Sequence, residues 1–338
     1  MKFTEILEHF RALGGTANNI KLRYGDFGKS LSPIDPKLPI KIIAPNNLLI
    51  SPNCIKLNNK NQIRLKLKSK FRLDSKLVNF FEQYQEFFGW GDGGLSEVES
   101  RHLELKALPE KIKLLLLSLG WIKYDFYEKN PKDYLKDYFI SRQIRIKSES
   151  KIMPIFDLIN HSSKGNSYIL DNGVRFEGVF KDELLANYHR NFDAFHFYRN
   201  YGVPTESSTI LSCDVNIEIP DIAIIKISRL DNLISSENAL LEPRIKVIDS
   251  EIHISFLEIS GKTGSELPRK NFIEQMQKFN ILQAELNKIF DGLIDHNIKV
   301  RKDLIAESKN CLYKVARDIE QIAVEQLNVL SKAKNYLN

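Results

Sequence analysis

The chain has 338 residues, with 49 basic and 43 acidic side chains and a formal net charge of +6. Hydrophobic residues make up 43% and charged residues 27%, a balance typical of globular proteins that excludes an intrinsically disordered chain. No stretch approaches the roughly 20 consecutive apolar residues that cross a bilayer, so we expect no membrane-spanning segment.

The three cysteines, Cys54, Cys213 and Cys311, lie far apart in the sequence. Their spacing does not match that of metal-binding pairs, so we expect no metal site. Free cysteines fit a reducing compartment, and we therefore expect a cytoplasmic protein. The N-terminus carries acids at Glu5 and Glu8, which indicates the start of an amphipathic helix and not a signal peptide.

The positive charge does not gather in one block. Lys66, Lys68 and Lys70 alternate with apolar residues, the pattern of a strand with one solvated basic face. A nucleic-acid groove is the alternative interpretation, but no aromatic-rich binding motif accompanies these lysines. We expect no nucleic-acid partner.

Short strands follow a first helix in residues 1–72. Alternation or apolar runs predict strands at Ile20–Tyr24, Ile40–Ile43 and Leu48–Ile50, separated by turns rich in Gly, Pro and Asp. Strand signals return from Ile152 to about Ile259.

The segment between these two regions, about residues 74–140, predicts helices instead. Asp74 or Ser75 is a suitable cap for the first of them. Further helices are expected at Ser96–Leu105, Pro109–Leu119 and Tyr134–Arg142, and a glycine-rich loop at 89–94 follows the first helix. The pattern is therefore β, then a helical insert, then β.

The chain becomes helical again after Gly261 and stays so to its end. One apolar stripe comprises Phe272, Met276, Phe279, Leu282, Leu286, Ile289 and Leu293. A second stripe, at steps of three and four, comprises Leu312, Val315, Ile319 and Ile322. The two stripes predict two long helices packed as an antiparallel pair.

The most informative motif is Asp157-Leu158-Ile159-Asn160-His161, which is followed at some distance by Asn187-Tyr188 and by Tyr201-Gly202-Val203. In this order and spacing, these residues resemble the cofactor-binding and catalytic strip of SET-domain protein methyltransferases. The resemblance extends to the subgroup typified by the Rubisco large-subunit lysine methyltransferase.

This resemblance implies that the cofactor is S-adenosylmethionine. Asn160 and His161 match the pair that binds it, and Arg142 matches a residue that contacts its carboxylate. Gly28 matches the glycine turn that covers it. Asp157 matches the acid ahead of the Asn-His pair. It is either a cofactor contact or a buried hydrogen-bond partner that orders the turn.

Three tyrosines match residues at the reacting end of the family's site. Tyr188 matches the catalytic tyrosine, whose hydroxyl lies near the transferred methyl group. Tyr201 matches a residue that lines both the cofactor site and the lysine channel, and Tyr168 matches another wall of that channel. Tyr198 is the alternative to Tyr188, but the separation of the family's two tyrosines matches that of Tyr188 and Tyr201 and so favours Tyr188.

Methyl transfer from a sulfonium to lysine makes specific demands on such a site. A free lysine has a pKa near 10.4, yet the acceptor must be the neutral amine. Desolvation and a nearby positive sulfur both lower the amine pKa. The site must also align nitrogen, methyl and sulfur, since most of the available rate gain comes from positioning.

The resemblance implies an α+β fold. A SET domain at residues 1–268, with a β-rich core of short sheets and a helical insert at about 74–140, would be followed by a C-terminal helical domain at 269–338 that binds the protein substrate. The implied activity is S-adenosylmethionine-dependent protein-lysine N-methyltransfer by a monomer. Two alternatives stay open: methylation of a histidine, and a non-catalytic SET-like module that binds protein.

Overall fold

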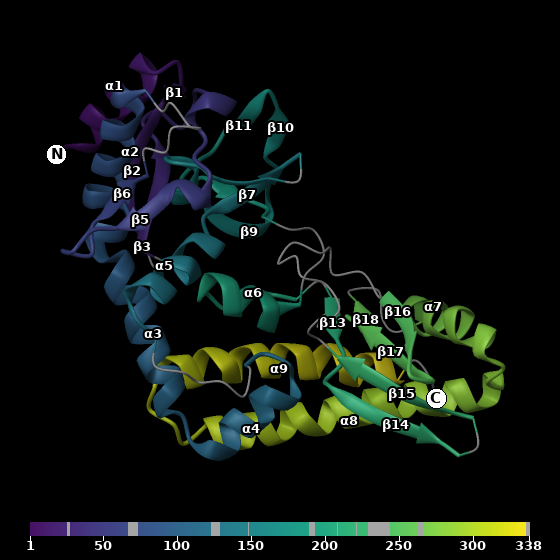
Figure 1. The fold of residues 1–338 in the computed structure, drawn as a ribbon. Coiled ribbons are helices and arrows are strands. Elements are labelled where there is room, and N and C mark those ends of the chain that lie inside the picture. Colours follow the sequence, from purple (N-terminus) through teal and green to yellow (C-terminus); the bar gives the residue numbers. More distant parts are fainter. Residues whose placement is uncertain are drawn as a thin grey trace. The chain divides into compact units, whose positions relative to one another are not determined.

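The computed structural model describes residues 1–25, 28–66, 74–122, 129–147, 149–188, 193–207, 209–220, 222–228, 244–261 and 266–335. The chain divides into two compact units, each described here by itself (Figure 1). The first unit comprises Met1–His102 and Glu128–Arg190, and the second comprises Leu103–Tyr127 and Asn191–Asn338. The predicted domain boundary at residue 268 lies inside the second unit, and that boundary stays a prediction.

The first unit combines helices with short strands. Its helices are α1 (Phe3–Ala12), α2 (Ser75–Phe88), α3 (Leu95–Ala107, which continues past the unit's boundary) and α5 (Pro131–Ile140), with short helical turns η1 (Asn46–Leu48), η2 (Pro52–Cys54), η3 (Trp90–Gly94) and η4 (Phe156–Leu158). Its strands are β1 (Thr16–Asn18), β2 (Ile20–Gly25), β3 (Gly28–Pro33), β4 (Ile40–Pro45), β5 (Ile55–Leu57), β6 (Ile63–Leu65), β7 (Gln143–Ile146), β8 (Glu149–Ile152), β9 (Asn160–Asn166), β10 (Ile169–Asp171), β11 (Gly173–Gly178) and β12 (Leu185–Ala186).

These strands form several small sheets and no single large one. The largest has the order β1-β4-β11-β10 and is antiparallel throughout, while β2-β3, β5-β6 and β7-β8 are antiparallel pairs. β9 and β12 pair in parallel. Alternation decides which side chains enter the core. In β4, Ile40, Ile42 and Ala44 are buried, whereas Lys41 is exposed.

Helix α2 packs its apolar face against the same core. It begins at a true cap, because the Asp74 carboxylate accepts a hydrogen bond from the Lys76 N–H at 2.8 Å. Phe80, Phe81 and Tyr84 on one face of α2 are at most 1% exposed. This face places the Tyr84 hydroxyl deep in the first unit, which matters for the site.

The second unit also mixes helices and strands. Its elements are α4 (Glu110–Ser118), α6 (Ala194–Tyr201), β13 (Thr209–Leu211), β14 (Val215–Ile219), β15 (Ala223–Ser228), β16 (Arg244–Ile248), β17 (Glu251–Ser255), β18 (Glu258–Gly261), α7 (Glu266–Met276), η5 (Gln277–Phe279), α8 (Gln283–Ser308) and α9 (Lys314–Asn335).

The long helices α8 and α9 lie side by side (Figure 1). A sheet of order β14-β15-β17-β16, in which β15 and β17 are parallel, shares one hydrophobic core with α7 and α8. A second core joins α4 and α6 to α8 and α9. A polar group is buried beside it: the Asn297 side chain accepts from the Cys213 N–H at 3.0 Å and from Arg301 at 2.9 Å.

The predicted α+β class is confirmed, and so is the helical end of the chain. Three local predictions were wrong. The strand expected at Leu48–Ile50 is the end of η1 and a single bridge from Ile50 to Ile152. The first apolar stripe of the tail belongs to two helices, α7 and α8, because Asn280 adopts a left-handed conformation (φ 60°) that ends η5.

The third error concerns α6, which lies in the region Ile152 to about Ile259, where strands were expected. Start and stop signals were present: the Asp193 carboxylate accepts from the Phe195 N–H at 2.9 Å, and Gly202 ends the helix at φ 71°. None of the helices in the described ranges has the length and apolar character to cross a membrane. Lys68 and Lys70 of the basic strand pattern lie outside the described residues.

Candidate active site

The candidate strip consists of residues 157–161 and Tyr188. It lies where β9 pairs with β12. Asn160 opens β9 directly after η4, and it pairs with Leu185, while the next paired residue of β12, Ala186, lies opposite Asn166. The register shift lets the two backbones approach closely. A Cβ added at Gly165 would lie 2.6 Å from the carbonyl oxygen of Leu185, so glycine is required there.

The pairing of β9 with β12 brings Tyr188 into contact with His161 of the Asn-His pair. The Tyr188 N–H donates to Nδ1 of His161 at 3.2 Å, and the Tyr188 hydroxyl donates to the backbone carbonyl of Ile159. The two rings are 5.2 Å apart between centroids. Both ends of Tyr188 are therefore fixed by residues on either side of Asn160.

Tyr168 completes an aromatic group beside this pair. Its ring stacks on that of Tyr188, with centroids 6.3 Å apart and an angle of 21° between the planes. The rings of Phe156 and Phe176 lie 6.1 and 5.6 Å from it. The Tyr168 hydroxyl donates to the Phe156 carbonyl at 3.4 Å. The structure thus places the rings of Tyr168 and Tyr188 together, and the predicted roles of the two residues stay predictions.

His161 is held in a neutral form. Burial lowers the pKa of His161 to about 4, so its imidazole carries no charge at neutral pH. Because Nδ1 accepts a hydrogen bond from Tyr188, the proton of the neutral ring belongs on Nε2. The imidazole therefore acts as an acceptor toward the Tyr188 backbone and adds no positive charge to the strip.

The Asn160 amide is oriented by a carboxylate. Its Nδ2 donates to Oε1 of Glu183 at 2.7 Å. An ionised carboxylate only accepts, so this contact fixes which end of the amide faces Glu183. The Asn160 carbonyl oxygen is the acceptor end of the same amide and does not face Glu183.

Asp157 points into the helical insert. It accepts a hydrogen bond from the hydroxyl of Tyr84, which is fully buried on α2. Burial raises the pKa of Asp157 to about 6, although the Tyr84 hydroxyl and the Arg142 guanidinium both act to lower it. Asp157 was expected either to contact the cofactor or to order the turn by a hydrogen bond. The contact with Tyr84 supplies the partner that the second role needs.

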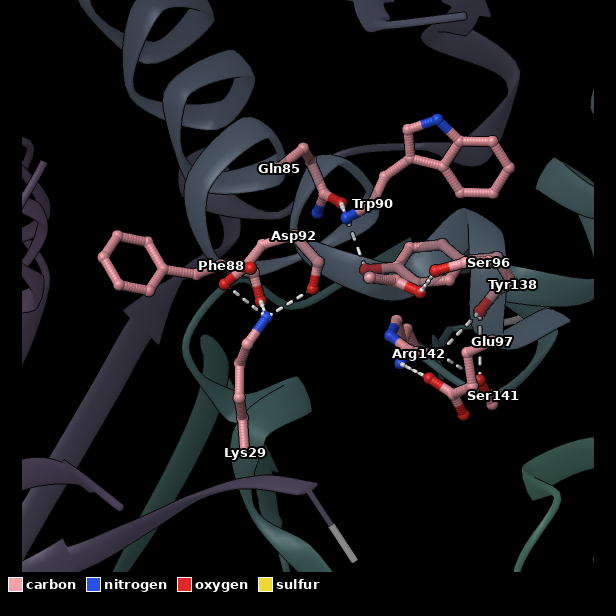
Figure 2. A network of polar contacts seen from close by, with 11 residues as sticks. Lys29, Gln85, Phe88, Trp90, Asp92, Ser96, Glu97, Tyr138, Ser141 and Arg142 are labelled. Atoms are coloured by element: carbon pink, nitrogen blue, oxygen red, sulfur yellow. Dashed lines mark hydrogen bonds and ion pairs between the residues drawn. The ribbon is translucent and has the colours of Figure 1, made fainter. Parts of the chain in front are cut away.

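Arg142 lies at the end of α5 in a cluster drawn in Figure 2. Its guanidinium is 3.8 Å from the centroid of the Tyr138 ring, and Nη1 donates to the Ser141 hydroxyl at 2.8 Å. Nη2 forms an ion pair with Glu97 at 3.8 Å. Glu97 is mostly exposed, so this pair is easily exchanged for another carboxylate.

The glycine turn around Gly28 shows no contact with the other candidate residues among those described. Gly28 lies exposed at the tip of the β2-β3 hairpin, with φ 87° and open space where a Cβ would be. Its neighbour Lys29 has a defined position instead. Its Nζ donates to the carbonyl oxygen of Asp92 at 2.6 Å and pairs with the Asp92 carboxylate at 2.6 Å, so it holds the turn after α2 (Figure 2).

Tyr201 belongs to the second unit. It is the last residue of α6, and its ring stacks on Phe197 with centroids 4.3 Å apart. Burial raises the pKa of Tyr201 to about 12, so its hydroxyl stays protonated. The described contacts within the second unit fix the ring of Tyr201, and its predicted place beside the cofactor stays a prediction.

The structure therefore brings Asn160, His161, Tyr168 and Tyr188 into one contiguous group, with Asp157 in the turn just before it. Two partners were missed from the sequence. They are Glu183, which orients Asn160, and Tyr84, which binds Asp157. Neither belongs to a recognisable motif, and Tyr84 lies 73 residues from its partner, so only the fold reveals them. Among the described residues, no group of three or more His, Cys, Asp or Glu side chains is placed to hold a metal ion.

No protein-family model matches the chain, and no curated protein matches it significantly. Solved structures do match. The chain is similar to a structure of Rubisco LSMT bound to AdoMet, with 13% identity and a TM-score of 0.42, over 98% of this chain and 90% of that one. It is also similar to the SET domain of LSMT bound to MeLysine and AdoHcy, with 13% identity, a TM-score of 0.41 and the same coverage.

Proposed function

We propose that the protein is an S-adenosylmethionine-dependent protein N-methyltransferase that modifies a lysine side chain. The observation that supports this most is the position of Tyr188. Its hydroxyl donates to the Ile159 carbonyl and its N–H to His161, so a tyrosine oxygen is fixed beside the Asn160-His161 pair. Sequence segments that match the family's strip only by order and spacing meet in space.

The hydrogen bond to Ile159 gives the Tyr188 oxygen a defined role. Its proton is committed to the backbone carbonyl, so its lone pairs face any group that approaches from the other side. A lone pair can accept a hydrogen bond from a reacting amine or contact the polarised methyl group of a sulfonium. The contribution of Tyr188 is positioning and electrostatic, which suits a displacement that needs no covalent enzyme intermediate.

The charges around the strip fit a cationic donor. Glu183 contributes a carboxylate next to Asn160, and the half-buried His161 stays neutral at physiological pH. S-adenosylmethionine carries a sulfonium and an ammonium; a nearby carboxylate favours both, and a neutral imidazole does not repel them. The Asn160 carbonyl oxygen would accept from the ammonium, and Arg142 would exchange Glu97 for the cofactor carboxylate.

The test is transfer of a labelled methyl group from S-adenosylmethionine to proteins of a lysate from the source organism. Tyr188→Phe removes one hydroxyl and should retain cofactor binding, yet lose most turnover, by about 100-fold or more. Tyr24→Phe is the matched control, because Tyr24 is 69% exposed on β2 and should react like the wild type. Full turnover in the Tyr188→Phe protein would refute this assignment.

Mass spectrometry of the labelled product identifies the acceptor. Label on lysine supports the proposal, and label on histidine replaces the acceptor while keeping the chemistry. Failure of the wild type to bind S-adenosylmethionine would favour the non-catalytic binding module. The monomeric state, the cytoplasmic location and docking of the protein substrate on residues 269–338 stay predictions.

A further inference from the structure

The turn that precedes the candidate strip carries backbone strain. Ile155 has φ 76°, in the left-handed region, although it is β-branched and fully buried. Such a conformation persists only where the surrounding structure holds it. Two backbone hydrogen bonds close the turn locally, from Asp157 N–H to the Met153 carbonyl and from Leu158 N–H to the Ile155 carbonyl, both at 3.2 Å.

A side chain of the helical insert anchors the strained turn. The Tyr84 hydroxyl donates to the Asp157 carboxylate from the buried face of α2. The ring of Tyr84 is itself fixed between Phe80 and Phe88, each 6.3 Å away between centroids. A rigid aromatic column therefore holds one end of the turn.

The other end of the turn is the carbonyl that fixes the catalytic tyrosine. The Ile159 N–H donates to the Phe156 carbonyl at 3.0 Å, and the Ile159 carbonyl accepts from the Tyr188 hydroxyl. Only one residue separates Asp157 from Ile159. A displacement at Asp157 is therefore transmitted directly to the hydrogen bond that orients the Tyr188 oxygen.

We infer that Tyr84 is a positioning residue of the methyl-transfer reaction: by holding Asp157 it keeps the strained turn 153–159 in place, and with it the Ile159 carbonyl that aims the Tyr188 hydroxyl. This inference rests on the proposed function. It makes the helical insert a part of the catalytic machinery through one hydrogen bond, and it assigns Asp157 to structure and not to the cofactor.

The electrostatic surroundings of Asp157 make the contact testable by pH. Asp157 is influenced by Tyr84 on α2, by Arg142 after α5 and by Lys29 on β3, and it acts in turn on Tyr138 of α5. Tyr84 is the group that contacts it by a hydrogen bond, and that bond lowers the pKa of Asp157 against the larger effect of burial. Its loss should make Asp157 easier to protonate.

The experiment compares Tyr84→Phe with Tyr134→Phe, which removes a hydroxyl from another buried tyrosine of the same insert, on α5. Tyr84→Phe should lower kcat by about tenfold to 100-fold, the scale of one buried acceptor left without its donor, while the KM for S-adenosylmethionine changes less than about threefold. The pKa of the Asp157 carboxyl, followed by NMR titration, should rise in the same protein, because the hydrogen bond that lowers it is lost. Tyr134→Phe should show neither effect.

Two further measurements test the inference. One does not depend on activity, and the other uses a second variant in case Tyr84→Phe does not fold. Hydrogen exchange at the amides of Asp157, Leu158 and Ile159 should be about tenfold faster in Tyr84→Phe than in Tyr134→Phe. Asp157→Ala removes the acceptor of the same hydrogen bond, so it should reproduce the Tyr84→Phe defect and serves if that protein does not fold.

The outcomes separate this inference from the proposed function. If Tyr188→Phe is fully active, the proposed function fails, while the exchange measurement still reports on the turn. If Tyr188→Phe is inactive but Tyr84→Phe matches Tyr134→Phe in kcat, in the pKa of Asp157 and in exchange, the positioning role of Tyr84 is overturned and the proposed function stands.

Discussion

Replacement of Asp157 by Asn should stabilise the protein at neutral pH. The carboxyl is buried beside Tyr84, and burial raises the pKa of Asp157 from 3.8 to about 6. Asn is of similar size and still accepts the Tyr84 hydrogen bond, but it has no charge to bury. The substitution therefore isolates the free energy of holding an ionised carboxylate in the turn.

The sign and size of this stability difference follow from the pKa of Asp157 in the unfolded and in the folded protein. Below about pH 3.8 the carboxyl is protonated in both the folded and the unfolded protein, and the charge costs nothing. As the pH rises toward 6, the unfolded chain releases the proton first, so the folded state loses stability relative to it. A shift of about two units corresponds to roughly 3 kcal/mol, present in full above about pH 6.

Urea unfolding of both proteins at a series of pH values measures this difference. The chain has two tryptophans, Trp90 in the first unit and Trp121 in the second, so a Trp121→Phe background leaves Trp90 as the reporter of the unit that contains Asp157. Asp171→Asn, at an exposed strand position, controls for the change in net charge. A stability difference that stays flat from pH 4 to 7, or that falls, would refute the buried-carboxylate reasoning.

The remaining predictions concern other parts of the fold. Because burial lowers the pKa of His161 to about 4, folding stability should fall as the pH drops from about 6.5 toward 4, and His161→Asn should flatten that dependence in unfolding titrations. Gly165→Ala should lower stability by about 2 kcal/mol or more, since its Cβ would meet the Leu185 carbonyl; an unchanged melting temperature would contradict this. Asn297→Ala should cost about 2 kcal/mol in the second unit, because it leaves the buried Cys213 N–H without its acceptor; unaltered urea unfolding would argue against that contact.

The sequence allowed the contiguous parts of the site to be predicted. Asn160 and His161 are adjacent, and Tyr188 follows at a spacing that the family's strip shares, so order alone was enough to select them. The structure places these residues close together across β9 and β12, and their roles stay predictions. That these side chains contact the cofactor is part of the proposed function.

The supporting partners could not be predicted, because no local pattern joins them to the strip. Tyr84 reads as one more apolar position on an amphipathic helix, and its hydroxyl gains meaning only once α2 packs against the turn. Glu183 reads as a solvated charge. Tertiary packing decides both roles. The apolar periodicity of the helix predicts only that Tyr84 is buried.

Helix α6 is a different case, since local signals were present and were not used. Asp193 is a favourable cap, Gly202 a favourable terminator, and the residues between them are the length of a short helix. The aromatic residues between these two signals are common in strands, so composition alone does not favour a helix here. Asn280 in the tail carried a comparable stop signal, and it divides α7 and η5 from α8.

Calorimetric titration with S-adenosylmethionine tests the central claim most directly, because it needs no knowledge of the protein substrate. The predicted result is saturable binding to one site, retained in Tyr188→Phe and weakened by about tenfold or more in Asn160→Ala, whose lost carbonyl oxygen would face the cofactor ammonium. Absence of binding to the folded wild-type protein, or equal affinity in Asn160→Ala, would contradict a cofactor site on this strip.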